Sequence, residues 1–364
     1  MKYCKTALPF FISLLIVLPS VVRSAGMTTH MWMTQEAMEM VEDPGLKKIL
    51  KKNRDAVYGG AGFPDYGGAS SYIKKYEDNK RPLRRSHDPD FIEAYKGYVV
   101  EKCAPDFSRD NCPALVAHLM GTAAHGMEDQ VYNRLFMEKA YSIDIPADQR
   151  KEYNMDVSAD VLMVATHNRW FHLPPYHTPI DDLIRVYDTI GVTTSKPELK
   201  AGVRIYKTAL VAERVGLPLV YLKYKRELKW CDKNIAEHQG GVYHSAEVVA
   251  RYWESIWAEM NKDKPDLLIA TWPGTNGELA RGDFAAAVFS KHVDGKTVTS
   301  DNFRLLDSDG KVVPSNVELY RQYVVAVVPD GELENGEYTL VVKGVRGVNG
   351  KELTSPIYTS FISP

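Results

Sequence analysis

The sequence predicts a multidomain protein in which an all-α domain is followed by an all-β sandwich. Apolar residues recur with helical spacing up to Met260. Beyond residues 263–265 the pattern changes to short apolar runs separated by turn dipeptides such as Asp309-Gly310 and Asn335-Gly336. The length of 364 residues also suggests two domains.

The N-terminus has the pattern of a secretory signal. Lys2 and Lys5 precede an apolar run over residues 7–22, and small residues follow it. Cleavage before Ala25 would make residues 1–24 a signal peptide, and an uncleaved N-terminal anchor is the alternative. We therefore expect a protein that is secreted, periplasmic or attached to the cell surface.

The helical domain is expected over residues 25–262. Residues 27–52 form an amphipathic helix interrupted at Pro44-Gly45, and residues 58–72 form a glycine-rich loop with Asp65 at its centre. A further helix starts at the run Ser86-His87-Asp88-Pro89-Asp90. The remaining predicted helices cover residues 117–136, 156–167, 180–190, 197–215, 217–238 and 242–260.

The β domain is expected over residues 263–364. Strand-length apolar runs cover residues 284–289, 323–328, 338–342 and 357–361, which together indicate a sandwich of about 100 residues. It carries no cluster of histidines and carboxylates of catalytic type.

The net charge and the cysteines indicate which partners and which cellular compartment to expect. The net charge of −2 implies no basic surface, so we expect no nucleic-acid partner. Cys103 and Cys112 enclose eight residues and fit a local disulfide in an oxidising compartment. Cys231 is then an unpaired, buried thiol.

The stretch over residues 117–136 carries polar groups that a buried helix would not choose. His125 and Asp129 are four residues apart and share one helical face, as two metal ligands can. The alternative is a buried histidine beside an ordinary carboxylate. Gly121 lies one turn earlier, where it would let another backbone approach closely.

Two further places offer polar groups of the same kinds. Asp156 and Asp160 are also four apart, and Glu152 extends their row, although an acidic first turn favoured by the helix dipole explains them equally well. His30 begins the first helix, close to the amino terminus that cleavage before Ala25 would create.

Taken together, these motifs resemble the secreted zinc-dependent phospholipases C and the catalytic domain of glycosylphosphatidylinositol-specific phospholipases D. The start Thr29-His30-Met31-Trp32, the Asp65 segment, the Ser86–Asp90 run and the His125–Asp129 pair occur in the family's order. Asn168-Arg169-Trp170, Asp181-Asp182-Leu183 and Val186-Tyr187 are similar to the phospholipase D branch. The C-terminal region resembles bacterial Ig-like domains of the surface-layer type.

The resemblance implies a cluster of up to three zinc ions. One metal would take Asp65, His87, His125 and Asp129. A second would take His30, the free amino terminus and a bridging oxygen of Asp129. Asp65 is also the expected catalytic residue, orienting or deprotonating the attacking water.

The third metal site departs from the family pattern. Asn133 or a neighbour stands where relatives place a histidine, and a Glu152-x-x-x-Asp156 pair, or Asp156-x-x-x-Asp160, replaces a histidine-containing pair. Oxygen ligands suit cations harder than zinc. The resemblance therefore implies two zinc ions and a third divalent ion of a different kind, or an empty third site.

The function expected from this resemblance is an exported, metal-dependent phospholipase of the C or D type that hydrolyses phospholipid head groups at a membrane surface. The Ig-like domain would dock it to a cell surface or another protein. One alternative is a secreted zinc nuclease, which the net charge and the order of the motifs disfavour. The other is a non-catalytic protein that binds lipid or a surface on the same fold.

Overall fold

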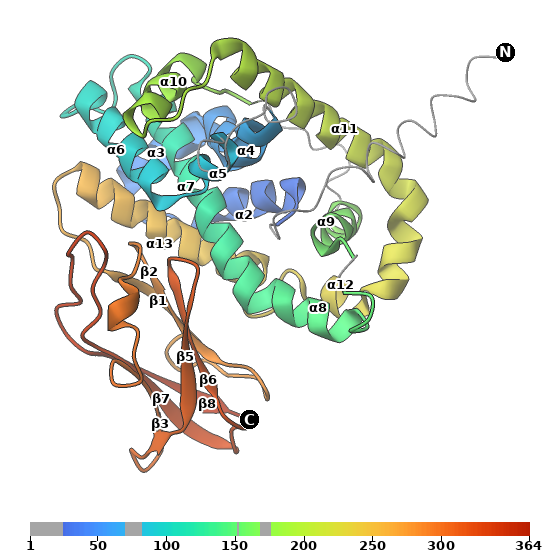
Figure 1. The fold of residues 1–364 in the computed structure, drawn as a ribbon, viewed down its shortest axis with the longest axis vertical. Helices are drawn as coiled ribbons and strands as arrows, with labels where there is room; N and C mark the ends of the chain where they lie inside the picture. The colour runs from blue at the N-terminus through green and yellow to red at the C-terminus, as the bar shows by residue number, and fades with distance from the viewer. Residues whose placement is uncertain (1–24, 70–81, 151–152, 168–175) are drawn as a thin grey trace. The chain divides into compact units, whose positions relative to one another are not determined.

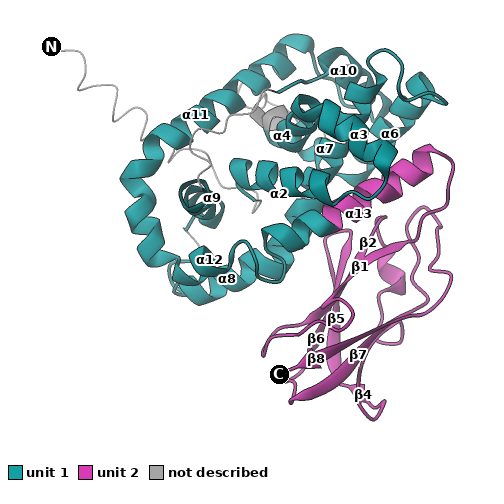
Figure 2. Ribbon diagram, turned by 180° about the vertical axis from the view of Figure 1, so that it is seen from behind, with its two compact units in different colours: residues 1–247 teal, residues 248–364 magenta. Residues whose placement is uncertain are grey.

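A computed structural model describes residues 25–69, 82–150, 153–167 and 176–364. The chain divides into two compact units, residues 1–247 and 248–364, coloured separately in Figure 2. The first is helical and the second contains antiparallel sheets, in the predicted order. The division falls within helix α13, upstream of the boundary expected after residue 262. The predicted signal segment and Glu152 lie outside the described residues.

Helices dominate the described part of the first unit, and the last of them, α13, continues into the second unit (Figure 1). Their bounds are α2 Met27–Met40, α3 Pro44–Lys52, α4 Arg54–Ala69, α5 Pro82–Ser86, α6 Pro89–Cys103, α7 Cys112–Tyr132, α8 Glu138–Asp144, α9 Met155–Thr166, α10 Ile180–Thr189, α11 Lys196–Glu227, α12 Lys229–Asn234 and α13 Val242–Met260. A π-helical turn, Asn133–Met137, joins α7 to α8. Helix α7 is buried along nearly its whole length and packs against α2, α3, α4 and α6.

The glycine-rich loop expected over residues 58–72 is wrong, because the described part of this segment lies in helix α4. Its glycines are used where the helix meets its neighbours. A Cβ atom on Gly59 would come within 2.0 Å of the His177 carbonyl oxygen, and one on Gly60 within 2.2 Å of the His118 carbonyl oxygen. The glycines therefore allow close helix packing, which outweighs their low helix propensity.

The break expected between residues 215 and 217 is also absent, since α11 continues from Lys196 to Glu227 through Pro218. Leu210 and Leu217 are seven residues apart and both fully buried. They keep one apolar face in register across the proline, so burial of that face sustains the helix.

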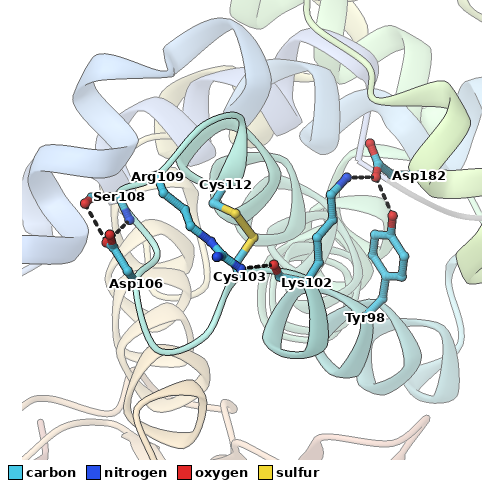
Figure 3. Close-up of a disulfide and its surroundings, with 8 residues drawn as sticks. All are labelled: Tyr98, Lys102, Cys103, Asp106, Ser108, Arg109, Cys112 and Asp182. Carbon is cyan, nitrogen blue, oxygen red and sulfur yellow. Dashed lines mark hydrogen bonds and ion pairs between the residues drawn. A yellow bond between two sulfur atoms is a disulfide. The ribbon is translucent and has the colours of Figure 1, made fainter.

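The predicted disulfide joins Cys103 at the end of α6 to Cys112 at the start of α7 (Figure 3). Beside it, Asp182 of α10 accepts hydrogen bonds from Tyr98 and Lys102 of α6. Cys231 is buried and unpaired, as predicted. The bridge therefore fixes the start of α7 against α6.

The second unit contains two four-stranded antiparallel sheets, ordered β1-β2-β6-β5 and β4-β3-β7-β8. Phe289 of one sheet and Phe303 of the other lie with ring centroids 6.2 Å apart, so the sheets share a core. The strands are β1 Leu268–Trp272, β2 Ala285–Phe289, β3 Phe303–Asp307, β4 Val312–Val313, β5 Ser315–Tyr320, β6 Val324–Pro329, β7 Gly336–Val342 and β8 Ile357–Ser363. The predicted strands correspond to β2, β6, β7 and β8.

Within the described ranges, none of the helices combines the length and the apolar character that crossing a bilayer requires.

Candidate metal centre

Five of the predicted site residues converge inside the helical unit. His30 comes from α2, Asp65 from α4, His87 from the turn between α5 and α6, and His125 and Asp129 from α7. They form two overlapping groups, each with its ligand atoms within 4.8 Å of one another: His30 with Asp65 and His125, and His87 with His125 and Asp129. Residues up to 99 positions apart are thus gathered around one helix.

The tightest group surrounds the imidazole of His125. Its Nε2 lies 3.0 Å from Nε2 of His87, and each of these nitrogens lies 3.7–3.8 Å from Oδ1 of Asp65 and 3.9 Å from Oδ2 of Asp129. Ligand atoms about 2.0–2.1 Å from a tetrahedral zinc ion lie about 3.3 Å apart. The observed distances of 3.0–3.9 Å between these atoms lie on both sides of that value. Two imidazole nitrogens and two carboxylate oxygens therefore surround a space of the size that a zinc ion requires.

A second bond fixes which nitrogen of His125 faces this space. Its Nδ1 donates to the carbonyl oxygen of Ala61, 2.7 Å away. The proton therefore sits on Nδ1, and Nε2 carries the lone pair that a metal requires. Burial lowers the pKa of His125 well below its usual range, and the nearby charge of His30 lowers it further, so the ring is neutral at pH 7.

Glycine at the crossing of α4 and α7 makes the Ala61 contact possible. A Cβ atom on Gly121 would lie 2.0 Å from the carbonyl oxygen of Val57 and 2.8 Å from the nitrogen of Ala61. No side chain fits there, so the two backbones touch. The predicted role of Gly121 is confirmed, and its effect is to bring Ala61 and Asp65 against the ring of His125.

His30 lies against the other side of His125, with the two rings stacked and their centroids 3.9 Å apart. Nδ1 of His30 is 2.7 Å from Oε2 of Glu128, and Nε2 is 3.3 Å from Oδ1 of Asp129. Thr34, one turn further along α2, donates to Oε1 of Glu128. A histidine held by a carboxylate on Nδ1 presents Nε2 as a ligand, which is the usual arrangement behind metal-binding histidines.

The pKa shifts of His30 and Asp129 are consistent with a site for a cation between them. Burial alone would lower the pKa of His30, but hydrogen bonds to Asp129 and Glu128 raise it well above its usual range. Burial would raise the pKa of Asp129, but its electrostatic interaction with His125 and its hydrogen bond to the positively charged His30 hold it well below its usual range. Asp129 is therefore an anion, and a divalent cation would supply the positive charge that a proton on His30 otherwise provides.

The first turn of α2 is held by Asp160 of α9. Its carboxylate accepts hydrogen bonds from the backbone nitrogens of Thr28 and Thr29 and from the Thr29 hydroxyl, at 2.6–3.0 Å. A Cβ atom on Gly26 would lie 2.3 Å from the Asp160 side chain, so glycine is required there. Asp160 thus positions the helix that carries His30, and a role as a capping group explains its burial.

Access to the centre is one-sided. The side chains of His30, His125 and Asp129 are at most 1% exposed, whereas those of Asp65 and His87 are 29% and 18% exposed. Burial raises the pKa of the Asp65 carboxyl above its ordinary value. A ligand from solution would meet Asp65 and His87 first.

The residues expected at a third metal are not gathered into these groups. Asp156 is half-buried in the first turn of α9 and belongs to neither group, and Glu152 lies outside the described residues. Asn133 is buried at the start of the π-helical turn. Burial raises the pKa of the neighbouring Tyr132 hydroxyl, and the negative charges of Asp160 and Asp156 contribute to the increase.

Sequence reasoning missed Glu128. It adjoins Asp129 but points about 100° away around α7, so helical spacing from His125 does not select it. The sequence does contain one indication of its role, which is a charged residue at the centre of an apolar helix. Charges are rarely buried without a partner, so such a residue is expected to bind one.

Because Glu128 contacts His30, we expect its substitution to weaken metal binding at His30 and to leave the site around His87 and His125 unchanged. In Glu128→Gln the amide keeps the shape but removes the charge that orients His30, so we expect about 10- to 100-fold weaker binding of one metal. Zinc titration by calorimetry should then resolve one weakened and one unchanged site. The exposed change Glu39→Gln is the control, and two unchanged sites in Glu128→Gln would contradict the role given to this carboxylate.

Comparison with known proteins places these residues in context. No protein-family model matches the chain. Over 188 residues it is 28% identical to mouse phosphatidylinositol-glycan-specific phospholipase D, a match that covers 49% of this chain and 22% of that protein. The chain is similar in sequence to a phospholipase. The rat enzyme of the same name is 25% identical over 179 residues, covering 46% of this chain and 21% of the relative.

The chain therefore spans about a fifth of the length of the curated relatives it matches. Among solved structures, it resembles the Escherichia coli copper resistance protein PcoC over 27% of this chain and 96% of that chain, with 16% identity and a TM-score of 0.22. The N-terminal part of the bacterial S-layer protein SbsC gives 12% identity and a TM-score of 0.24 over 85% of this chain and 79% of that chain. Scores this low carry no argument about fold or function.

Proposed function

We propose that the protein is an exported, metal-dependent phosphodiesterase that hydrolyses phospholipid head groups. The observation that carries the proposal is the convergence of Nε2 of His87, Nε2 of His125 and the carboxylates of Asp65 and Asp129 on one space. The sequence similarity to a phospholipase D supports the choice of substrate class.

In this proposal the four converging groups hold one zinc ion. Asp129 and His30, whose Oδ1 and Nε2 lie 3.3 Å apart, would hold a second zinc ion. The third ligand of that ion would be the α-amine of Ala25, freed by removal of the signal peptide. Ala25 is buried, at 3% exposure, five residues before His30. A third divalent ion would use oxygens of Asp156, Glu152 and the neighbourhood of Asn133.

Divalent ions bound here would lower the pKa of a water molecule and offset the charge of the phosphate oxygens. The chain's own residues would define the direction of attack. His30, His125 and Asp129 close the buried side, so the phosphodiester enters past Asp65 and His87. Asp65 would orient the attacking water and take its proton, a role favoured by its raised pKa.

Metal removal tests the proposal. The purified mature protein should contain about two zinc ions per chain by elemental analysis. Dialysis against a chelator should abolish release of head groups from phosphatidylinositol and phosphatidylcholine, and added zinc should restore it. Full turnover by metal-free protein would contradict a metal-dependent mechanism. Cleavage of single-stranded DNA without lipid cleavage, or tight lipid binding with no product, would assign the centre to the nuclease or non-catalytic alternative.

Export and surface attachment complete the proposal. The signal-like N-terminus would direct the chain out of the cytoplasm and into an oxidising compartment. The Cys103–Cys112 bridge is stable in such a compartment. The β unit, as an Ig-like domain, would dock the enzyme to a cell surface or another protein. N-terminal sequencing of the exported protein should find Ala25 as its first residue.

A further inference from the structure

Helix α11 has an unusual outward face. Val211, Val215, Leu219 and Leu222 are 47%, 65%, 63% and 63% exposed, and their spacing of four, four and three residues places them on one side of the helix. The opposite side is buried through Leu199, Tyr206, Leu210 and Leu217. A helix that packs by one face normally carries polar residues on the other, so these four residues form an apolar stripe that faces solvent.

Every charged residue that is exposed on α11 is positive. The apolar stripe lies between two basic groups, which are Lys200, Arg204 and Lys207 before it and Lys223, Lys225 and Arg226 after it, while Lys196 at the start of the helix pairs with Asp181. The three acidic residues of the helix are less exposed: Glu198 contacts Thr194, Glu213 contacts Thr28 and Arg214, and Glu227 contacts Tyr153 and, at 4.0 Å, Lys223. The outward surface is thus apolar at its centre and cationic at both ends.

The first basic group also borders a recess. Lys200 and Arg204, one turn apart, line an open pocket of about 350 Å³ together with Tyr176, His177 and Thr178. Within the described part of the chain, neither of the two basic side chains meets a carboxylate. A pocket with two cations, a phenol and a hydroxyl suits a phosphate group.

We propose that the outward face of α11 docks the protein onto an anionic phospholipid bilayer. The four apolar side chains would enter the boundary between head groups and acyl chains, while the flanking lysines and arginines meet lipid phosphates. A second copy of this chain fits the surface less well. Both ends of the stripe are cationic, so either orientation of two such helices brings like charges together. The inference concerns binding alone and is measured without turnover, so it stands or falls separately from the catalytic proposal.

Vesicle flotation tests this surface. The full chain should bind vesicles of phosphatidylcholine mixed with phosphatidylserine, bind pure phosphatidylcholine more weakly, and lose affinity as salt increases. The double variant Val215→Glu with Leu219→Glu should bind the mixed vesicles at least about tenfold more weakly. The vesicle affinity of the milder double variant, Val215→Ser with Leu219→Ser, should lie between those of the wild type and the glutamate variant. The comparison separates the effect of lost apolar contact from that of added negative charge.

A matched control lies in the β unit, where Val312 and Val348 are 49% and 61% exposed. Val312→Glu with Val348→Glu adds the same charge at similar exposure and should leave vesicle binding unchanged. The far-UV circular dichroism spectrum and the midpoint of thermal unfolding should be the same in both double variants and the wild type, which shows that the fold is intact. Equal vesicle binding by the α11 variant and the wild type would overturn the proposal. So would a wild-type dimer that dissociates in the α11 variant while vesicle binding persists.

Discussion

The substitution Asp129→Asn should remove both tightly bound metals and with them all hydrolysis. The Asp129 carboxylate faces His30 with one oxygen and the His87–His125 pair with the other: Oδ1 is 3.3 Å from Nε2 of His30, and Oδ2 is 3.9 Å from Nε2 of His87 and of His125. The amide keeps the volume but not the charge. We expect metal affinity to fall by more than about 100-fold. The substitution removes a metal ligand itself, whereas Glu128→Gln changes a residue that only orients a ligand.

Elemental analysis and turnover of phosphatidylinositol on the same sample would measure this effect. Asp181→Asn is the matched control, because Asp181 is an exposed carboxylate of the same unit and pairs with a surface lysine, Lys196. The control should retain both metals and full activity. Two metals retained in Asp129→Asn would show that the observed convergence of side chains is not a binding site.

Gly121→Ala should destabilise the helical unit by about 3 kcal/mol or more. The added methyl would lie 2.0 Å from the backbone oxygen of Val57, and backbone cannot move aside as a flexible side chain can. Helices α4 and α7 must then separate. Ala61 and Asp65 would move away from His125, so metal affinity should fall along with stability.

Gly97→Ala in α6 is the control, and its effect should have the opposite sign. Gly97 is also within a helix, but a Cβ atom there meets nothing within 4 Å. Alanine should therefore stabilise by about 0.5–1 kcal/mol through helix propensity. Urea denaturation of both variants gives the comparison. A loss of less than about 1 kcal/mol for Gly121→Ala would mean that the crossing is looser than described.

The sequence was most informative where a pattern is local. The spacing of His125 and Asp129 places them on one face of one helix, and the Cys103–Cys112 separation predicts their bridge. The glycines of α4 show the opposite case, because glycine allows both a tight turn and a close helix crossing. Only the partner helix α7 decides between these uses, and it lies about 60 residues along the chain.

Groups that support the centre were harder to predict for the same reason. Glu128 is recognisable only once α2 is known to pass beside α7, and the Ala61 carbonyl oxygen carries no sequence signal at all. Asp160 was noted for its spacing to Asp156, yet its function is to cap α2. Strands β1, β3, β4 and β5 were missed because they are short or weakly alternating and are defined by pairing with distant strands.

The cap on α2 bears on the order in which the centre assembles. Thr28 and Thr29 are held by Asp160, and Thr28 also by Glu213 and Arg214, more than 130 residues away in sequence. Contacts with such large sequence separation form slowly, because a long loop must close first. During synthesis, His87 and His125 can meet before Asp160 and Glu213, which hold the first turn of α2, have left the ribosome. The helix that carries His30 is therefore held at its start only after α11 has emerged, so we expect the α2 side of the centre to form last.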